Sequence, residues 1–209
     1  MRTVRWHAVV VAVLTLALAA GCGRPSTEPE PPRTPPPVDL TSVPAALTWE
    51  TYRGVRLPRS PVDGPKNVAA VTNGYSHTPQ GAVLAAIRGQ AYLILASDNE
   101  WGRVVATLTA PGPGRDEFAA HRAALSVTGP VPPGQGPSFT GFKVTHYRTD
   151  PPTAAVHISM QIGTPVRTFA YPVALQWIGD WRIVLPTAAD AVDAIELHSL
   201  DGYTRLEDK

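Results

Sequence analysis

The chain has 209 residues, with 18 Lys and Arg against 17 Asp and Glu, and one cysteine, Cys22. A net charge of +1 and the lack of any run of about five like charges give no support to nucleic-acid binding or to attraction to an anionic lipid surface. One cysteine cannot form a disulfide within the chain, so burial alone must stabilise the folded part.

The N-terminus is typical of an export signal. Arg2, Arg5 and His7 precede an apolar run of thirteen residues, 8–20, and no acidic residue occurs in or before that run. The run is shorter than the about 20 residues that a membrane-spanning helix needs. We therefore expect residues 1–21 to be a cleaved signal peptide.

The four residues that follow the apolar run, Ala19-Ala20-Gly21-Cys22, resemble the lipobox of bacterial lipoproteins. Ala19 stands where such motifs usually carry Leu. The resemblance implies that Cys22 accepts a diacylglyceryl group and palmitate, and that the protein is held at the extracytoplasmic face of the cell membrane. Two acyl chains hold a protein firmly, whereas one does so only marginally. The alternative is an ordinary secretory signal with a chance cysteine.

A proline-rich segment comes next, with eight of the 23 prolines between Gly23 and Ala46. Each proline removes an amide donor and restricts the residue before it, which excludes a helix or a central strand. Residues 22–46 are therefore predicted to be a tether that reaches on the order of 70 Å in polyproline II geometry. The alternative is a proline-rich ligand for a binding module.

Residues 47–209 are predicted to form one globular domain, because about 160 residues suffice to bury roughly 70% of the unfolded surface. Residues 49–58 indicate an extended strip laid over a core, and residues 59–67 a loop. The strongest helix signal covers residues 79–96, where only Arg88 and Gln90 are strongly polar. A helix that is apolar nearly all round is a buried helix.

Two more helices are expected after this one. Ser97 with Glu100 three residues later fits a capping box, and a helix over residues 115–126 follows a Pro/Gly stop. The apolar period then changes to two, which predicts strands over residues 142–147, 154–162, 169–177 and 181–185. Pro172 cannot donate to a ladder, so the third of these strands should be an edge or bulge there. Residues 188–209 are ambiguous: the pattern allows a short helix at 189–197 and a last extended piece at 203–206.

Three helices followed by about four antiparallel strands predict an α+β fold. The order resembles the cystatin-like or NTF2-like architecture. That resemblance implies a curved antiparallel sheet of about four strands that encloses a cone together with the helices.

Segments 54–58, 63–65 and 74–86 resemble a family of uncharacterised actinobacterial exported proteins and lipoproteins over roughly residues 49–186. The most specific phrase is Ser76-His-Thr-Pro-Gln80. The resemblance implies an association with conjugative or integrative elements, and a distant likeness to VirB8-like and TcpC-like transfer proteins, which are scaffold subunits. This chain departs from the VirB8-like plan because its expected anchor is a lipid and not a transmembrane helix.

The same phrase supplies four candidate binding residues, Ser76, His77, Thr78 and Gln80. A helix start offers unpaired amides and a positive dipole end that can hold an anion or a partner's carboxylate. The alternative is that Thr78 caps the helix, Gln80 assists and His77 packs against the neighbouring loop.

His146 is the candidate group for the inside of the cone, because it shares a face with Phe142 and Val144 in the predicted strand. A cavity of a few hundred Å³ around it would favour a ligand, and a hydrogen-bonded core histidine is the alternative. Trp177 and Trp181 flank the predicted hairpin turn, where they can anchor a partner or pack as a strand pair.

No catalytic, cofactor-binding or metal-binding residues are predicted, because the histidines lack paired spacing and the only thiol is assigned to the lipid. We expect a non-enzymatic interaction or scaffold module with an envelope protein as partner, such as an accessory subunit of a conjugation or secretion assembly. No nucleic-acid partner is expected. The alternative is a small-ligand carrier or an NTF2-like enzyme that uses the interior of the cone.

Overall fold

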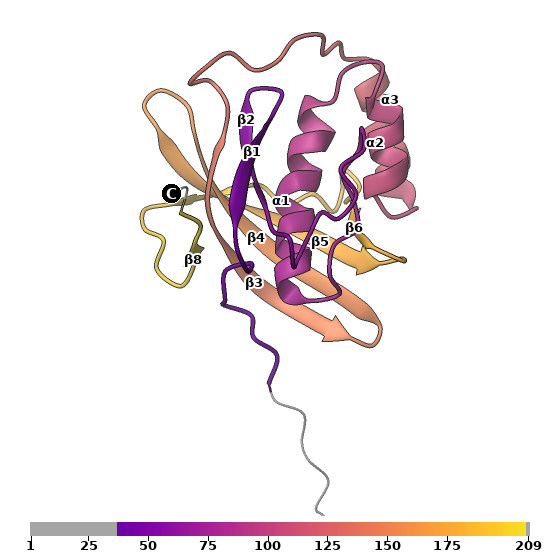
Figure 1. Ribbon diagram of the computed structural model, residues 1–209. Coiled ribbons are helices and arrows are strands. Elements are labelled where there is room, and N and C mark those ends of the chain that lie inside the picture. Colours follow the sequence, from indigo (N-terminus) through magenta and orange to yellow (C-terminus); the bar gives the residue numbers. More distant parts are fainter. Residues whose placement is uncertain (1–36, 208–209) are drawn as a thin grey trace, which may run out of the picture. The chain divides into compact units, whose positions relative to one another are not determined.

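The computed structural model describes residues 37–207 (Figure 1). The expected signal peptide, Cys22 and the tether as far as residue 36 lie outside the described residues. The elements in chain order are β1 (Thr48–Tyr52), β2 (Val55–Arg59), α1 (Pro79–Leu95), α2 (Trp101–Leu108), α3 (Pro113–Ala123), β3 (Ser138–Thr149), β4 (Pro152–Ile162), β5 (Arg167–Trp177), β6 (Trp181–Val184), β7 (Ile195–Leu197) and β8 (Thr204–Arg205).

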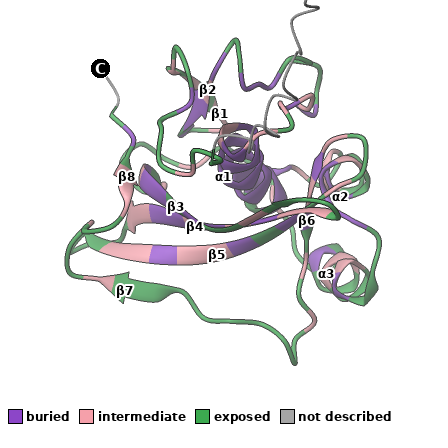
Figure 2. Cartoon of the chain, turned by 90° about the horizontal axis from the view of Figure 1, so that it is seen from below, coloured by how far each residue is buried: buried purple, intermediate pink, exposed green. Residues whose placement is uncertain are grey.

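Helix α1 is the centre of the described domain and lies between two sheets, as Figure 2 shows. Fifteen of its 17 residues are buried, so the prediction of a buried helix is confirmed. The hairpin β1–β2 covers α1 on one side, and the main sheet packs on it through β3, β4, β5 and β6. Burying a helix on both sides requires the all-round apolar surface that the sequence shows.

The main sheet has six strands, all paired antiparallel, in the order β6-β5-β4-β3-β8, with β7 also paired to β5. Apolar residues of β3, β4 and β5 join those of α1 in one buried core cluster. Phe142, Val156 and Ile158 are completely buried there. The period-two pattern therefore located the three long strands correctly.

The expected cystatin/NTF2-like fold, with helices followed by a curved sheet of about four strands, is wrong. A β-hairpin precedes the helices, because the strip at residues 49–58 reverses at Arg53-Gly54, both with positive φ. The main sheet gains two further strands, β7 and β8, from the C-terminal segment. A short helix at residues 189–197 does not form, and part of that segment is β7. The described domain is richer in β structure than the pattern indicated.

The two shorter helices lie close to their predicted positions. The predicted capping box forms only in part: the Ser97 amide and hydroxyl donate to the Glu100 carboxylate at 3.4 and 2.7 Å, but the hydroxyl does not cap a helix amide, and α2 begins at Trp101. Helix α3 begins at Pro113, two residues before the predicted start, because proline suits the first helical turn.

Pro172 interrupts one edge of β5, in agreement with the expectation from its missing amide hydrogen. On that edge β6 pairs with residues 174–177 and β7 pairs with residues 168–170. Tyr171, Pro172 and Val173 are paired with β4 on the other edge and with neither of these two strands. The sheet therefore has a gap at Pro172, where the chain between β6 and β7 moves away from β5.

Candidate functional site

The start of α1 is held by a network of hydrogen bonds around Asp63. The Thr78 hydroxyl caps the helix by accepting from the Gly81 amide at 3.1 Å, and Pro79 occupies the first turn. The hydroxyls of Ser76 and Thr78 lie 2.6 Å apart, and both donate to one oxygen of the Asp63 carboxylate. Two of the segments that carry the family resemblance, 63–65 and 74–86, therefore meet in space.

A second carboxylate, Asp180 at the β5–β6 turn, fixes the chain just before this helix. It accepts from the amides of Gly74 and Tyr75 at 2.7 and 3.0 Å. The Trp181 indole, which is buried, donates to the Ser76 carbonyl at 2.9 Å. These bonds tie the turn of the last hairpin to the start of α1.

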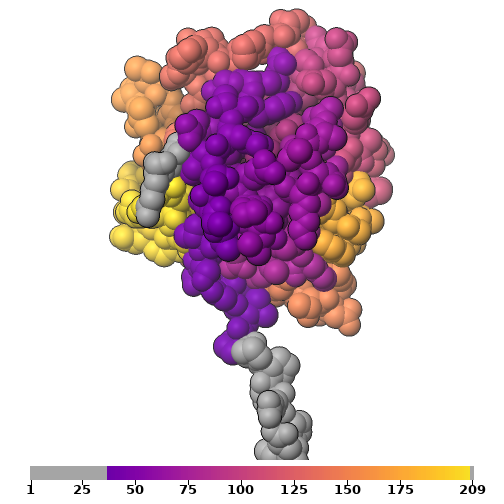
Figure 3. All heavy atoms as spheres, viewed as in Figure 1, coloured from indigo at the N-terminus to yellow at the C-terminus, as the bar shows by residue number. Residues whose placement is uncertain are grey.

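Gln80 contacts the chain that enters the domain. Its side-chain amide donates to the carbonyls of Asp39 and Ser42 at 3.1 and 3.2 Å. Asp63 also accepts from the Ala45 amide at 3.0 Å, and Thr204 donates to the Thr41 carbonyl at 2.8 Å. We call this set of contacts to residues 39–45 the N-terminal clasp. Figure 3 shows these N-terminal residues, in indigo, packed on the domain surface.

His77 belongs to an aromatic cluster with Tyr147, Trp177 and Trp181. Its ring stacks on Trp177 with centroids 4.3 Å apart, and the ring of Trp181 lies 5.5 Å away. The Tyr147 hydroxyl donates to the His77 carbonyl at 3.1 Å, and burial raises the pKa of Tyr147. All four residues of the Ser76–Gln80 phrase singled out by the sequence thus make contacts within the domain.

His146 is not inside the fold, so the face predicted for it is wrong. The β3–β4 register shifts between Val144 and His146, which is a β-bulge that reverses the alternation of side chains. His146 is exposed, with Nε2 3.3 Å from the Thr153 hydroxyl. Tyr147 is half-buried in its place and reaches His77. Neither of the two cavities described below is lined by His146.

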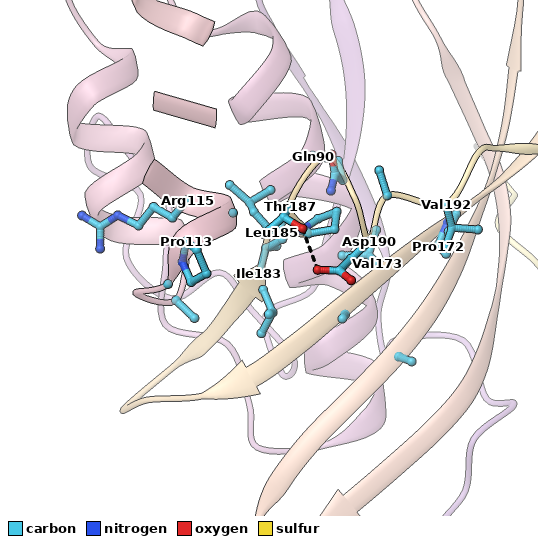
Figure 4. A pocket seen from close by; sticks show the side chains of 18 of the residues that line it. Gln90, Pro113, Arg115, Pro172, Val173, Ile183, Leu185, Thr187, Asp190 and Val192 are labelled. Carbon is cyan, nitrogen blue, oxygen red and sulfur yellow. Dashed lines mark hydrogen bonds between the residues drawn. The ribbon is translucent and has the colours of Figure 1, made fainter. Parts of the chain in front are cut away.

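Two adjoining cavities, of about 530 and 330 Å³, lie between α1, α3, β5 and the chain after β6. Figure 4 shows the larger one. They share Gln90, Tyr171, Leu185, Thr187 and Ala191 among their lining residues. We call the pair the Gln90 cleft. Volumes of this size are typical of small-molecule sites, which fall roughly between 300 and 1,000 Å³.

The walls of the cleft are mostly apolar, and its charged residues lie near the surface. The smaller cavity is lined by aromatic and thioether groups of Phe118, Phe139 and Met160. At the larger one, Asp190 is exposed and accepts from the Thr187 hydroxyl at 2.6 Å, the bond drawn in Figure 4. His157 also lines the larger cavity. Its burial lowers its pKa, and the positive charge of Lys143 lowers it to a lesser degree.

Gln90 is the exception to the apolar interior. It is 92% buried, at 8% relative exposure, and it lines both cavities. Figure 4 shows its side chain projecting from α1 into the larger cavity. Within residues 37–207 no hydrogen bond joins its carboxamide to another group. The fully enclosed side-chain atoms without a partner in the described residues are the Nε atoms of Arg53, Arg122 and Arg182, so the carboxamide of Gln90 stays accessible through the cleft.

The chain was compared with known protein families, curated proteins and solved structures. The family described as "Domain of unknown function (DUF8175)" matches residues 15–205. The chain belongs to the DUF8175 family. No curated protein and no solved structure matches it.

Two further observations concern the part of this DUF8175 protein that the structure describes. None of its helices reaches the length and apolarity that membrane crossing requires. Among residues 37–207, no group of three or more His, Cys, Asp or Glu side chains is placed to hold a metal ion.

The sequence contains one signal for the cleft. Gln90 is one of only two strongly polar residues in the helix over residues 79–96. Pattern alone does not distinguish it from Arg88, whose guanidinium is fully paired. The sequence predicts an edge or bulge at Pro172, but it does not show that β6 and β7 both pair with β5 and leave a gap there, or that a cavity forms at the gap.

Proposed function

We propose that this DUF8175 protein is a non-enzymatic interaction module, held by lipid at Cys22 on the extracytoplasmic face of the cell membrane. Its partner would be an envelope protein, and the module would serve as an accessory subunit of a conjugation or secretion assembly. The lipobox resemblance at residues 19–22 supports the anchor, and the resemblance to transfer proteins supports the kind of assembly.

The observation that carries this proposal is the N-terminal clasp. Its hydrogen bonds fix the point at which the chain from the expected tether enters the domain. Gln80, Asp63 and Thr204 hold residues 39–45 by hydrogen bonds from three separate parts of the fold. Asp63 and Gln80 both lie in segments that carry the resemblance to exported proteins, which supports a role for these segments where the expected tether enters the domain.

The anchor is tested by Cys22→Ser. The substitution removes the thiol that would accept the diacylglyceryl group, so we expect the protein to leave the membrane fraction or to keep its signal peptide. Fractionation with detergent partitioning and intact-mass measurement report both results. Unchanged partitioning together with unchanged mass would rule out lipidation.

The partner is tested separately, by cross-linking in intact cells followed by capture of the protein. We expect an envelope or secretion-machinery protein to be recovered with the wild-type chain and to be depleted with Cys22→Ser, because the released module no longer stays at the membrane. Recovery of no such protein would count against the interaction role, even if the lipid anchor is established.

A further inference from the structure

We infer that the Gln90 cleft binds a small, uncharged, mostly apolar molecule that carries one hydroxyl or carboxamide group. The inference goes beyond anchoring and partner binding, and it depends on neither. Three features of the described domain carry it: the shape of the cleft, its unpaired buried amide and the position of its charges.

The cleft is part of the backbone arrangement and does not arise from one side-chain position. Helix α3 meets the chain after β6 at Gly114, where an added Cβ would lie 2.1 Å from the Leu185 carbonyl oxygen. On the opposite wall, β5 lacks a neighbouring strand at Pro172. Close packing on one side and a missing strand segment on the other leave the two cavities open between them.

The carboxamide of Gln90 supplies a specific contact in this apolar space. It can donate two hydrogen bonds and accept others, and none of these is made within residues 37–207. The hydroxyl of Tyr171, which lines the same two cavities, also makes no hydrogen bond there. Because the carboxamide is not among the enclosed atoms without a partner, solvent can reach it, and a ligand with a hydroxyl or carboxamide group can replace that solvent with a direct hydrogen bond.

The charges around the cleft favour an uncharged ligand. Its ionisable lining residues, Arg115, Glu117, His121, His157 and Asp190, are each exposed or only partly buried. A charge placed beside Gln90 would therefore lose its water without a buried partner of opposite sign. The remaining interior, with Phe118, Phe139 and Met160, suits an alkyl or aromatic body.

The test compares octanamide with octanoate, which share a chain length but differ in charge. The full chain carrying Cys22→Ser is titrated with each probe and followed by heteronuclear NMR, so that no acyl group of the protein itself competes for the cleft. We expect saturable shifts at Tyr171, Leu185 and the Gln90 side-chain amide with octanamide, and at least about tenfold weaker binding of octanoate. No saturable shift at these residues, or equal binding of the two probes, would overturn the inference.

Two variants connect the binding to the cleft. Gln90→Leu keeps the size of the side chain and removes the amide, so octanamide should bind about tenfold more weakly. Ala191→Trp fills the cleft from an exposed position that lines both cavities, and Ala189→Trp is its matched control outside them. We expect loss of binding in the first and wild-type binding in the second.

The inference can still be overturned if one of these variants fails to fold. Circular dichroism checks each chain, and if Gln90→Leu is unfolded the comparison of Ala191→Trp with Ala189→Trp decides. Undiminished octanamide binding by folded Gln90→Leu, or by Ala191→Trp, would show that the molecule binds elsewhere. Failure of octanamide binding leaves the anchor and partner tests unaffected, since those read membrane association and cross-linking.

Discussion

Arg88 and Gln90 are two polar side chains on the buried helix α1, and their surroundings are opposite. Arg88 is completely buried, and its guanidinium donates to the Pro58 carbonyl, to Thr72 and to Glu50, with 2.5 Å between Nη2 and Oε1 of Glu50. Gln90 has no such partners and faces the cleft. Arg88 thus connects α1 to the hairpin β1–β2, whereas Gln90 lines the cleft.

We predict that Glu50→Ala lowers the free energy of unfolding by about 2 kcal/mol, because it leaves the buried Arg88 guanidinium without its carboxylate. The value is moderate because the Glu50 side chain is 36% exposed, so solvent already screens the pair. Urea unfolding followed by tryptophan fluorescence measures the change.

The control for this prediction is Glu196→Ala, which removes the partner of Arg167 in a more exposed pair separated by 3.7 Å. That substitution should change stability by less than about 0.5 kcal/mol. Equal effects of the two substitutions would show that the Arg88–Glu50 pair does not stabilise the packing of the hairpin on α1.

At the scale of the element, the beginning of α1 is specified by its neighbours as much as by its own cap. Thr78 and Pro79 are local signals that any helix could carry. The carboxylates of Asp63 and Asp180, from a loop and from the last hairpin, complete the arrangement. This is why the phrase around Ser76 could be recognised as a helix start, whereas its binding partners could not.

Gly81 tests how closely that arrangement is packed. A Cβ at this position would lie 2.1 Å from the Ser76 carbonyl oxygen, so Gly81→Ala must displace backbone and should destabilise the domain by about 2 kcal/mol. Thermal or urea unfolding measures the loss.

The matched substitution is Gly102→Ala in α2, where no atom lies within 4 Å of the added Cβ. There alanine should be neutral or stabilise by at most about 1 kcal/mol through its higher helix propensity. A Gly81→Ala protein as stable as Gly102→Ala would contradict the close approach of residues 76 and 81.

At the scale of the whole molecule, the N-terminal clasp joins the tether to three distant parts of the fold. Gln80→Ala removes two of its hydrogen bonds, those to the carbonyls of Asp39 and Ser42. We expect amide hydrogens of residues 39–45 to exchange about tenfold faster, because each lost bond contributes about 0.5–1.5 kcal/mol. Hydrogen exchange with mass spectrometry reports this segment directly.

Gln135→Ala is the control for the clasp, since Gln135 is exposed and its side chain makes no hydrogen bond within the described residues. It should leave the exchange of residues 39–45 unchanged. If Gln80→Ala also leaves it unchanged, the segment is held by its other contacts and Gln80 is not part of the junction.

The sequence by itself determined the local features of this protein, because each depends on residues close together in the chain. The buried helix α1 follows from its apolar surface, its cap from Thr78 and Pro79, and the long strands from alternation. The break in the edge of β5 follows from the missing amide hydrogen of Pro172. The family match covers the same residues without assigning them a role.

Only the tertiary structure decided which of these elements meet, because that depends on pairings between distant residues. The bulge after Val144 turned His146 outward, the strip at residues 49–58 folded into the hairpin β1–β2, and residues 195–197 became β7. The extended piece considered at residues 203–206 contains β8, and only the fold shows that it pairs with β3. Gln90 and Arg88 look alike in the sequence, and their different roles follow from what the fold places opposite each. Whether a side chain faces a hydrogen-bond partner or a cavity depends on three-dimensional packing, and the neighbouring residues in the sequence do not determine it.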